Sequence, residues 1–180
     1  MAPPVASALG LAQTDFELFG LPPRFAIDRA DLDLRWKTLQ AQVHPDRFAS
    51  ADAQSQRQAM QWSVRVNEAY QRLKDPLKRA AYLCELHGVA IDAESNTAMP
   101  ADFLMQQMAW REALEDANTA GALDELADEV AGHRRDAVQA LQHAADERAD
   151  FVALAQQVRA LMFVERLRSE LEQRRDRIDN

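Results

Sequence analysis

Apolar side chains recur every three or four positions along two stretches of the first half of the chain, and this spacing is typical of amphipathic α-helices. The first stretch follows Asp28, a candidate helix cap, and its apolar positions are Leu32, Trp36, Leu39 and Val43. The second runs from about residue 53 to 73, with Ala59, Trp62, Ser63, Val66, Ala69, Tyr70 and Leu73 on one face. Pro45 ends the first helix, because a proline disfavours helical geometry in the preceding residue and has no N–H. The pattern predicts two helices joined by a turn.

The remaining pattern predicts a short helix, a linker and three longer helices. Asp75-Pro76 can begin the short helix and Gly88 can end it. Residues 88–100 lack a helical stripe and are rich in turn formers, which indicates a linker. Helical stretches follow near residues 101–117, 120–144 and 147–178, and their short connections predict an antiparallel bundle. Residues 1–13 are mostly small, so we expect a disordered arm there.

The charge balance excludes one class of partner. The chain has 21 Lys and Arg against 29 Asp and Glu, a net charge of −8. A protein that binds nucleic acid through bulk charge needs a net basic face, so we expect no nucleic-acid partner. The acidity is uneven, because residues 1–97 hold 11 basic and 12 acidic side chains and residues 98–180 hold 10 and 17.

The composition favours helix and argues against several kinds of chemistry. Five glycines and two tyrosines are few for a sheet protein. The single cysteine, Cys84, excludes an internal disulfide and a four-thiolate metal site, and its place on an apolar helix face predicts a core residue. Apolar runs stay below the ~18 residues of a membrane span, and no secretory pattern opens the chain, so we expect a cytoplasmic protein without a membrane partner.

Signals of an enzyme are lacking in the sequence. It contains no Gly-rich phosphate loop, HExxH or G-x-S-x-G pattern. His133 and His143 are ten residues apart, about 280° around a helix, so they do not converge on one ion. We therefore predict no catalytic residue, no metal and no cofactor.

The turn at His44-Pro45-Asp46 is the first candidate site. Pro45 stiffens the connection between two helices and leaves two polar side chains beside it, and a rigid, exposed pair loses little entropy when a partner binds. An ordinary corner, in which Asp46 only caps the next helix, would explain the same spacing.

The residues around this turn resemble a J-domain in order and spacing. Residues 15–22 read Asp-Phe-Glu-Leu-Phe-Gly-Leu-Pro, residues 43–49 read Val-His-Pro-Asp-Arg-Phe-Ala, and residues 67–76 read Asn-Glu-Ala-Tyr-Gln-Arg-Leu-Lys-Asp-Pro. The Phe-x-Leu-Phe-Gly-Leu-Pro opening and the Asp-Arg-Phe after the signature resemble the narrower family of HscB-type co-chaperones of iron–sulfur cluster assembly. Residues 101–117 and 159–171 resemble the C-terminal bundle of that family.

This resemblance implies an all-α fold in which an N-terminal J-domain, a helical hairpin with short helices at 14–87, joins a C-terminal three-helix bundle at 101–180. It implies an adaptor that stimulates the ATPase of a DnaK-class chaperone, HscA, and delivers the iron–sulfur scaffold IscU to it. The residues implied at the chaperone are His44, Pro45, Asp46, Arg47, Arg35 and Lys37. Residues 40–43, Gln-Ala-Gln-Val, depart from the basic stretch that many J-domains carry there.

A second candidate site lies on the helix expected at 101–117, which has two apolar faces. Phe103, Trp110 and Leu114 form a core stripe, whereas Leu104, Met105 and Met108 fall on another face. That second face could be buried between two neighbouring helices, or it could be an exposed partner site, because Met-rich surfaces adapt to partners. The resemblance implies the partner site, and the residues it implies at the scaffold are Leu104, Met105, Met108, Glu112, Asp116 and Phe163. Ala109 departs from the family, which has an acidic residue at this position.

Two other functions fit parts of the sequence. A general J-domain chaperone would carry a Gly/Phe-rich segment and CxxC zinc repeats, and the sequence has neither. A J-domain adaptor that recruits a different client to a DnaK-class chaperone stays open as the alternative.

Overall fold

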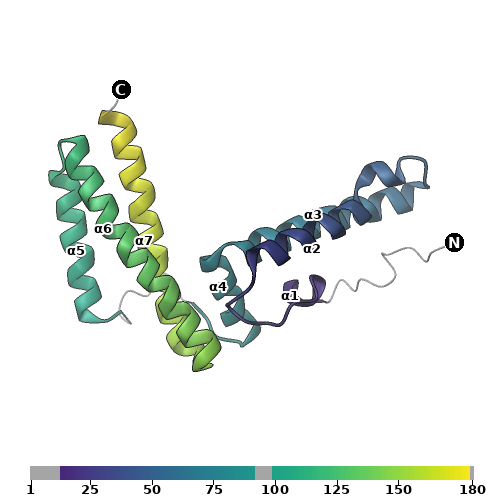
Figure 1. Cartoon of the computed structure of the whole chain (residues 1–180), viewed down its shortest axis with the longest axis horizontal. Helices are drawn as coiled ribbons and strands as arrows, with labels where there is room; N and C mark the ends of the chain where they lie inside the picture. Colours follow the sequence, from purple (N-terminus) through teal and green to yellow (C-terminus); the bar gives the residue numbers. More distant parts are fainter. Residues whose placement is uncertain (1–12, 92–98, 179–180) are drawn as a thin grey trace. The chain divides into compact units, whose positions relative to one another are not determined.

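The computed structural model describes residues 13–91 and 99–178, and all regular structure in these ranges is helical (Figure 1). The predicted all-α class is therefore confirmed. Most of the arm predicted at 1–13 and of the linker predicted at 88–100 lies outside the described residues. The chain divides into two compact units, residues 1–82 and 83–180. This division falls within α4 (Pro76–Leu86), and the domain limits drawn from the sequence stay a prediction.

The first unit is built around a helical hairpin. It contains α1 (Asp15–Leu18), α2 (Arg29–Val43), the 3-10 helix η2 (Pro45–Phe48), α3 (Ala53–Lys74) and the first turns of α4. Helices α2 and α3 lie side by side and are joined through η2, as the apolar periodicity predicted (Figure 1). Asp28 caps α2, because its Oδ1 accepts the Asp31 N–H at 2.9 Å. The predicted face of α3 is buried except at Ser63, which is half-buried.

Polar contacts set the register of the hairpin. The indole Nε1 of Trp36 donates to Asn67 Oδ1 at 2.9 Å, and its ring stacks on Tyr70 with centroids 4.6 Å apart. One turn further along α2, the Gln40 amide donates to Ser63 Oγ at 3.3 Å. Trp36 is half-buried, unlike a pure core residue, because its N–H needs a polar acceptor at the edge of the contact.

A buried carboxylate fastens α1 to α3. Asp15 is fully buried, with Oδ1 2.6 Å from Arg65 Nη1 and Oδ2 3.1 Å from Arg72 Nη1. The Asp15 N–H donates to the Tyr82 hydroxyl of α4 at 3.0 Å. Periodicity did not predict α1, because four residues are too few to show a stripe and its ionic partners lie 50 or more residues away.

We expect Asp15→Asn to lower the free energy of unfolding by about 2 kcal/mol, because it leaves two arginines without their shared counter-charge. Urea unfolding followed by circular dichroism measures the change. Asp33→Asn is the matched control, since Asp33 pairs with Arg29 at the surface, and it should cost much less than Asp15→Asn. Equal losses in the two variants would contradict the role given to Asp15.

The second unit is the predicted bundle of three helices. α5 (Ala101–Asp116), α6 (Ala120–Gln142) and α7 (Phe151–Ile178) lie side by side (Figure 1). Gly88, at a φ of 69°, ends α4 as predicted, and the Val89 N–H returns to the Cys84 carbonyl at 2.9 Å.

The start of the last helix differs from the expectation at residue 147. Residues His143–Glu147 form a π-helical turn, η4, and α7 begins at Phe151. Asp150 sets that start, because its Oδ1 accepts the Ala153 N–H at 2.9 Å and its backbone N–H donates to the Ala144 carbonyl. The apolar spacing of this segment did not identify Asp150 as the residue that caps the helix.

The buried stripe of α7 turns around the helix because its neighbours change along its length. Near its start, Phe151 stacks on His87 and Arg159 donates to the Ile91 carbonyl at 2.7 Å. Beyond residue 162, α7 faces α5, with Phe163 against Trp110 and Arg174 against the end of α5. The shift of the buried face between Val158 and Val164 is therefore a change of packing partner, and both residues are buried.

Candidate functional site

The His44-Pro45-Asp46 turn is exposed at the end of the hairpin. His44 ends α2 with an extended backbone, and Pro45 starts η2. The His44 side chain is 51% exposed and that of Asp46 is 90% exposed, whereas Pro45 is half-buried. The two polar groups are thus open to a partner, and the proline contributes to the packing of the turn.

An internal contact orders the two polar side chains. His44 Nδ1 accepts the Asp46 N–H at 3.3 Å and lies 3.5 Å from Asp46 Oδ2. When Nδ1 accepts, the neutral imidazole carries its proton on Nε2. Nε2 and the Asp46 carboxylate then present a donor and an acceptor from one rigid turn, which suits an arginine or a backbone group of a partner.

Two of the three implied basic residues are placed to assist this turn. Arg47 folds back so that its Nη1 donates to the Ala41 carbonyl at 3.1 Å, which places a positive charge over the last turn of α2. Lys37 is exposed on α2, seven residues before His44, and therefore on the same face about 10 Å along the helix. Arg47 and Lys37 supply positive charge on either side of residues 40–43.

Arg35 is held inside its own unit. Its Nε lies 2.9 Å from both carboxylate oxygens of Asp31, and its Nη1 donates to the carbonyls of Phe19 and Gly20 at 2.9 and 3.2 Å. Gly20 has a φ of 61°, and a Cβ there would lie 3.2 Å from Arg35 Nη1. The structure therefore gives Arg35 a structural role at the Phe19-Gly20 turn, away from the His44 face.

The second candidate site is the outer face of α5. Met105 and Met108 are 69% and 73% exposed, Leu104 is half-buried, and Glu112 and Asp116 are exposed. The sequence left two interpretations of this face open, and the exposure of both methionines excludes burial between two helices. They lie beside two carboxylates that continue the face toward the end of the helix.

Trp110 is the buried side chain that holds this face to the bundle, and Gln106 adds a second polar contact. α5, whose residues are all described, buries only Trp110, and the Trp110 indole Nε1 donates to Glu129 Oε1 of α6 at 2.8 Å. The same oxygen accepts Gln106 Nε2 at 3.2 Å. Glu129 therefore fixes α5 at two successive turns. This role could not be predicted from the sequence, because an acidic residue on a helix is typical of solvated surface.

Phe163 belongs to an aromatic cluster. Its ring lies 6.3 Å from Trp110 in a stacked arrangement and 6.1 Å edge-on from Phe103, and the Arg111 guanidinium lies 5.4 Å over its face. It is half-buried. The structure thus brings Phe163 to α5 on the side of the core stripe. Arg111, which the sequence analysis did not single out, forms the border between Phe163 and the solvent.

Groups of three or more His, Cys, Asp or Glu side chains that could hold a metal ion do not occur among the described residues. Cys84 is buried, and its thiol lies 3.8 Å from the Phe151 carbonyl. Burial raises the pKa of this thiol to about 11. The predicted core position is confirmed. In the ranges that the structure describes, helices long and apolar enough to cross a membrane are likewise absent.

We expect Cys84 to resist thiol reagents in the folded protein. With the pKa raised to about 11, only about 0.1% of the thiol is ionised near pH 8, and the thiolate is the reactive form. Labelling with a chromogenic disulfide should be slow in native buffer and fast in denaturant. Fast labelling in both would contradict the burial.

Residues 99–172 match the family model of the HSCB C-terminal oligomerisation domain. A co-chaperone protein HscB homolog from Bordetella petrii is 52% identical over 161 residues, which cover 89% of this chain and 95% of that protein. The homolog from Burkholderia thailandensis is 50% identical, covering 96% and 99%.

The chain belongs to the HscB family of co-chaperones. Solved structures of this family agree: chaperone HscB from Vibrio cholerae has a TM-score of 0.79 at 36% identity, over 92% of this chain and 99% of that one. The human co-chaperone HscB has a TM-score of 0.87 at 26% identity, over 92% and 84%. An HscB-family protein is a co-chaperone of iron–sulfur cluster assembly and not an enzyme. The resemblance drawn from the sequence and the fold that it implied are therefore confirmed.

Proposed function

We propose that this HscB-family protein stimulates ATP hydrolysis by the DnaK-class chaperone HscA and delivers the scaffold protein IscU to it. The observation that supports this most directly is the exposed His44-Pro45-Asp46 turn at the end of a rigid hairpin in an HscB-family chain. His44, Pro45, Asp46 and Arg47 contact the chaperone in this proposal, and Lys37 adds attraction to an acidic face of it. Arg35 has a structural role, because it donates to the carbonyls of the Phe19-Gly20 turn. We place the reaction in the cytoplasm.

The scaffold binds the outer face of α5. Met105 and Met108 supply the adaptable apolar contact, with Leu104 and Phe163 at its edge and Glu112 and Asp116 continuing it. Burying each methionine is worth roughly 1.5–3 kcal/mol before entropic costs, so a transient complex is the expected result.

Carrying both sites on one chain gives the adaptor its effect. A scaffold held on the second unit experiences a raised effective concentration of the chaperone recruited by the first. The turn favours the chaperone conformation that hydrolyses ATP by binding it more tightly than the other. Hydrolysis then holds the chaperone on the scaffold.

We expect His44→Gln to remove at least about nine-tenths of the ATPase stimulation, because the turn loses the imidazole while the hairpin keeps its contacts. Single-turnover ATP hydrolysis by HscA, measured with this protein, with IscU and with both, gives the readout. The wild type should act synergistically with IscU.

His143→Gln is the matched control, since His143 is an exposed histidine of the second unit. It should stimulate like the wild type. Equal stimulation by the two variants would show that the turn only connects two helices and does not act on the chaperone. Stimulation without synergy would favour the alternative client.

We expect Met105→Ala with Met108→Ala to weaken IscU binding about tenfold or more, because two exposed side chains lose the apolar area that the scaffold covers. Isothermal titration calorimetry measures the affinity, and ATPase stimulation without IscU should be unchanged. Met60→Ala is the control, because Met60 is 61% exposed on α3 of the first unit. An unaltered affinity in the double variant would show that the outer face of α5 is not the scaffold-binding site.

A further inference from the structure

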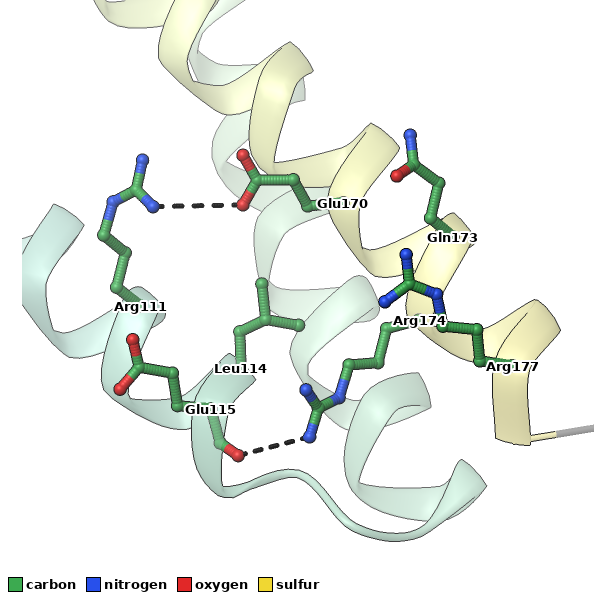
Figure 2. Close-up of a pocket in the computed structure, with 7 residues that line it drawn as sticks. All are labelled: Arg111, Leu114, Glu115, Glu170, Gln173, Arg174 and Arg177. Carbon is green, nitrogen blue, oxygen red and sulfur yellow. Dashed lines mark hydrogen bonds and ion pairs between the residues drawn. The ribbon is translucent and has the colours of Figure 1, made fainter.

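A pocket of about 250 Å³ opens between α5 and α7 beyond the aromatic cluster (Figure 2). Its walls include Arg111 and Glu115 from α5 and Glu170, Arg174 and Arg177 from α7. Figure 2 shows the side chains of Arg174 and Arg177 extending from α7 into the same space. Three arginines line this pocket, in the half of the chain that carries most of the net negative charge.

The pocket continues the proposed scaffold face. On α7, Glu170, Arg174 and Arg177 follow Phe163 by 7, 11 and 14 residues, so all four lie on one side of the helix. On α5, Arg111 and Glu115 follow Leu104 by 7 and 11 residues and share its side in the same way. The Arg111 guanidinium covers the Phe163 ring at 5.4 Å and also lines the pocket. Arg111 therefore links the aromatic cluster to the pocket.

The arginines keep donors available. Arg111 Nη1 lies 3.9 Å from Glu170 Oε2, too far for a hydrogen bond. Arg174 uses one nitrogen, Nη2, which donates to the carbonyls of Glu115 and Ala117 at 3.3 and 3.2 Å. The two glutamates in the walls do not balance three guanidinium groups. An added carboxylate beside Arg174 and Arg177 would meet fork-shaped donors.

We infer that this pocket accepts a carboxylate side chain of the bound iron–sulfur scaffold. The inference rests on the proposed function, since it extends the same binding face. The scaffold segment that fits has apolar side chains against Met108 and Phe163, followed by an acidic residue. Glu112 and Asp116 repel that acid from the outer face of α5, so the pocket fixes the direction in which the segment lies.

Arg177→Glu tests the pocket, because Arg177 is exposed in the last turn of α7 and lies outside the aromatic cluster. IscU affinity, measured by calorimetry at low salt, should fall about fivefold or more, and Arg177→Lys should change it less than about twofold. Arg135→Glu, with the same charge change at an exposed position of α6, should leave the affinity near that of the wild type. Circular dichroism checks that each variant is folded.

A double-mutant cycle identifies the occupant. Each exposed Asp or Glu of IscU is replaced by its amide and titrated against wild type and Arg177→Glu. One replacement should weaken binding to the wild type and lose its effect in the variant. Equal affinities of Arg177→Glu and Arg135→Glu, or a cycle in which no acidic residue of IscU is coupled to Arg177, would overturn the inference that the pocket accepts a carboxylate. These outcomes leave the proposed function standing, because that depends on the His44 variant and on the Met105 and Met108 variant.

Discussion

An indole packed between helices must place its N–H on an acceptor, and both candidate sites depend on this requirement. In the first unit, Trp36 of α2 donates to Asn67 of α3, and this contact sets the register of the hairpin that ends in the His44 turn. In the second unit, Trp110 of α5 donates to Glu129 of α6 and so holds the methionine face in place. Apolar burial brings the helices together, whereas these two directional bonds decide how far each slides along its neighbour.

The elements that the sequence predicted well are those with a long one-sided stripe. The helix expected at 53–73 is found at Ala53–Lys74, and its buried residues are those of the predicted face apart from the half-buried Ser63. The helix α1 was missed because its stability comes from Asp15, Arg65 and Arg72, which meet only in the folded unit. Local periodicity contains no information about such a contact.

The candidate sites also contain features that the sequence predicts and features that only the structure shows. The exposure of Met105 and Met108 could be decided only in the structure, because helical spacing places them on a second face without showing whether another helix covers it. Arg35 illustrates the opposite case, since a basic residue near the signature turned out to bond to the Phe19 and Gly20 carbonyls. Charge near a motif is therefore weaker guidance than the geometry of the donors that carry it.

The attachment of α5 by one fully buried residue has an evolutionary consequence. α6 and α7 bury four and seven side chains respectively, so the fold of the bundle rests mainly on that pair. Substitutions at exposed positions of α5 such as Met105 and Met108 are cheap for folding, and natural selection can alter these outward side chains with little penalty. Under the proposed function, the surface that selects a client can thus change independently of the hairpin proposed to bind the chaperone.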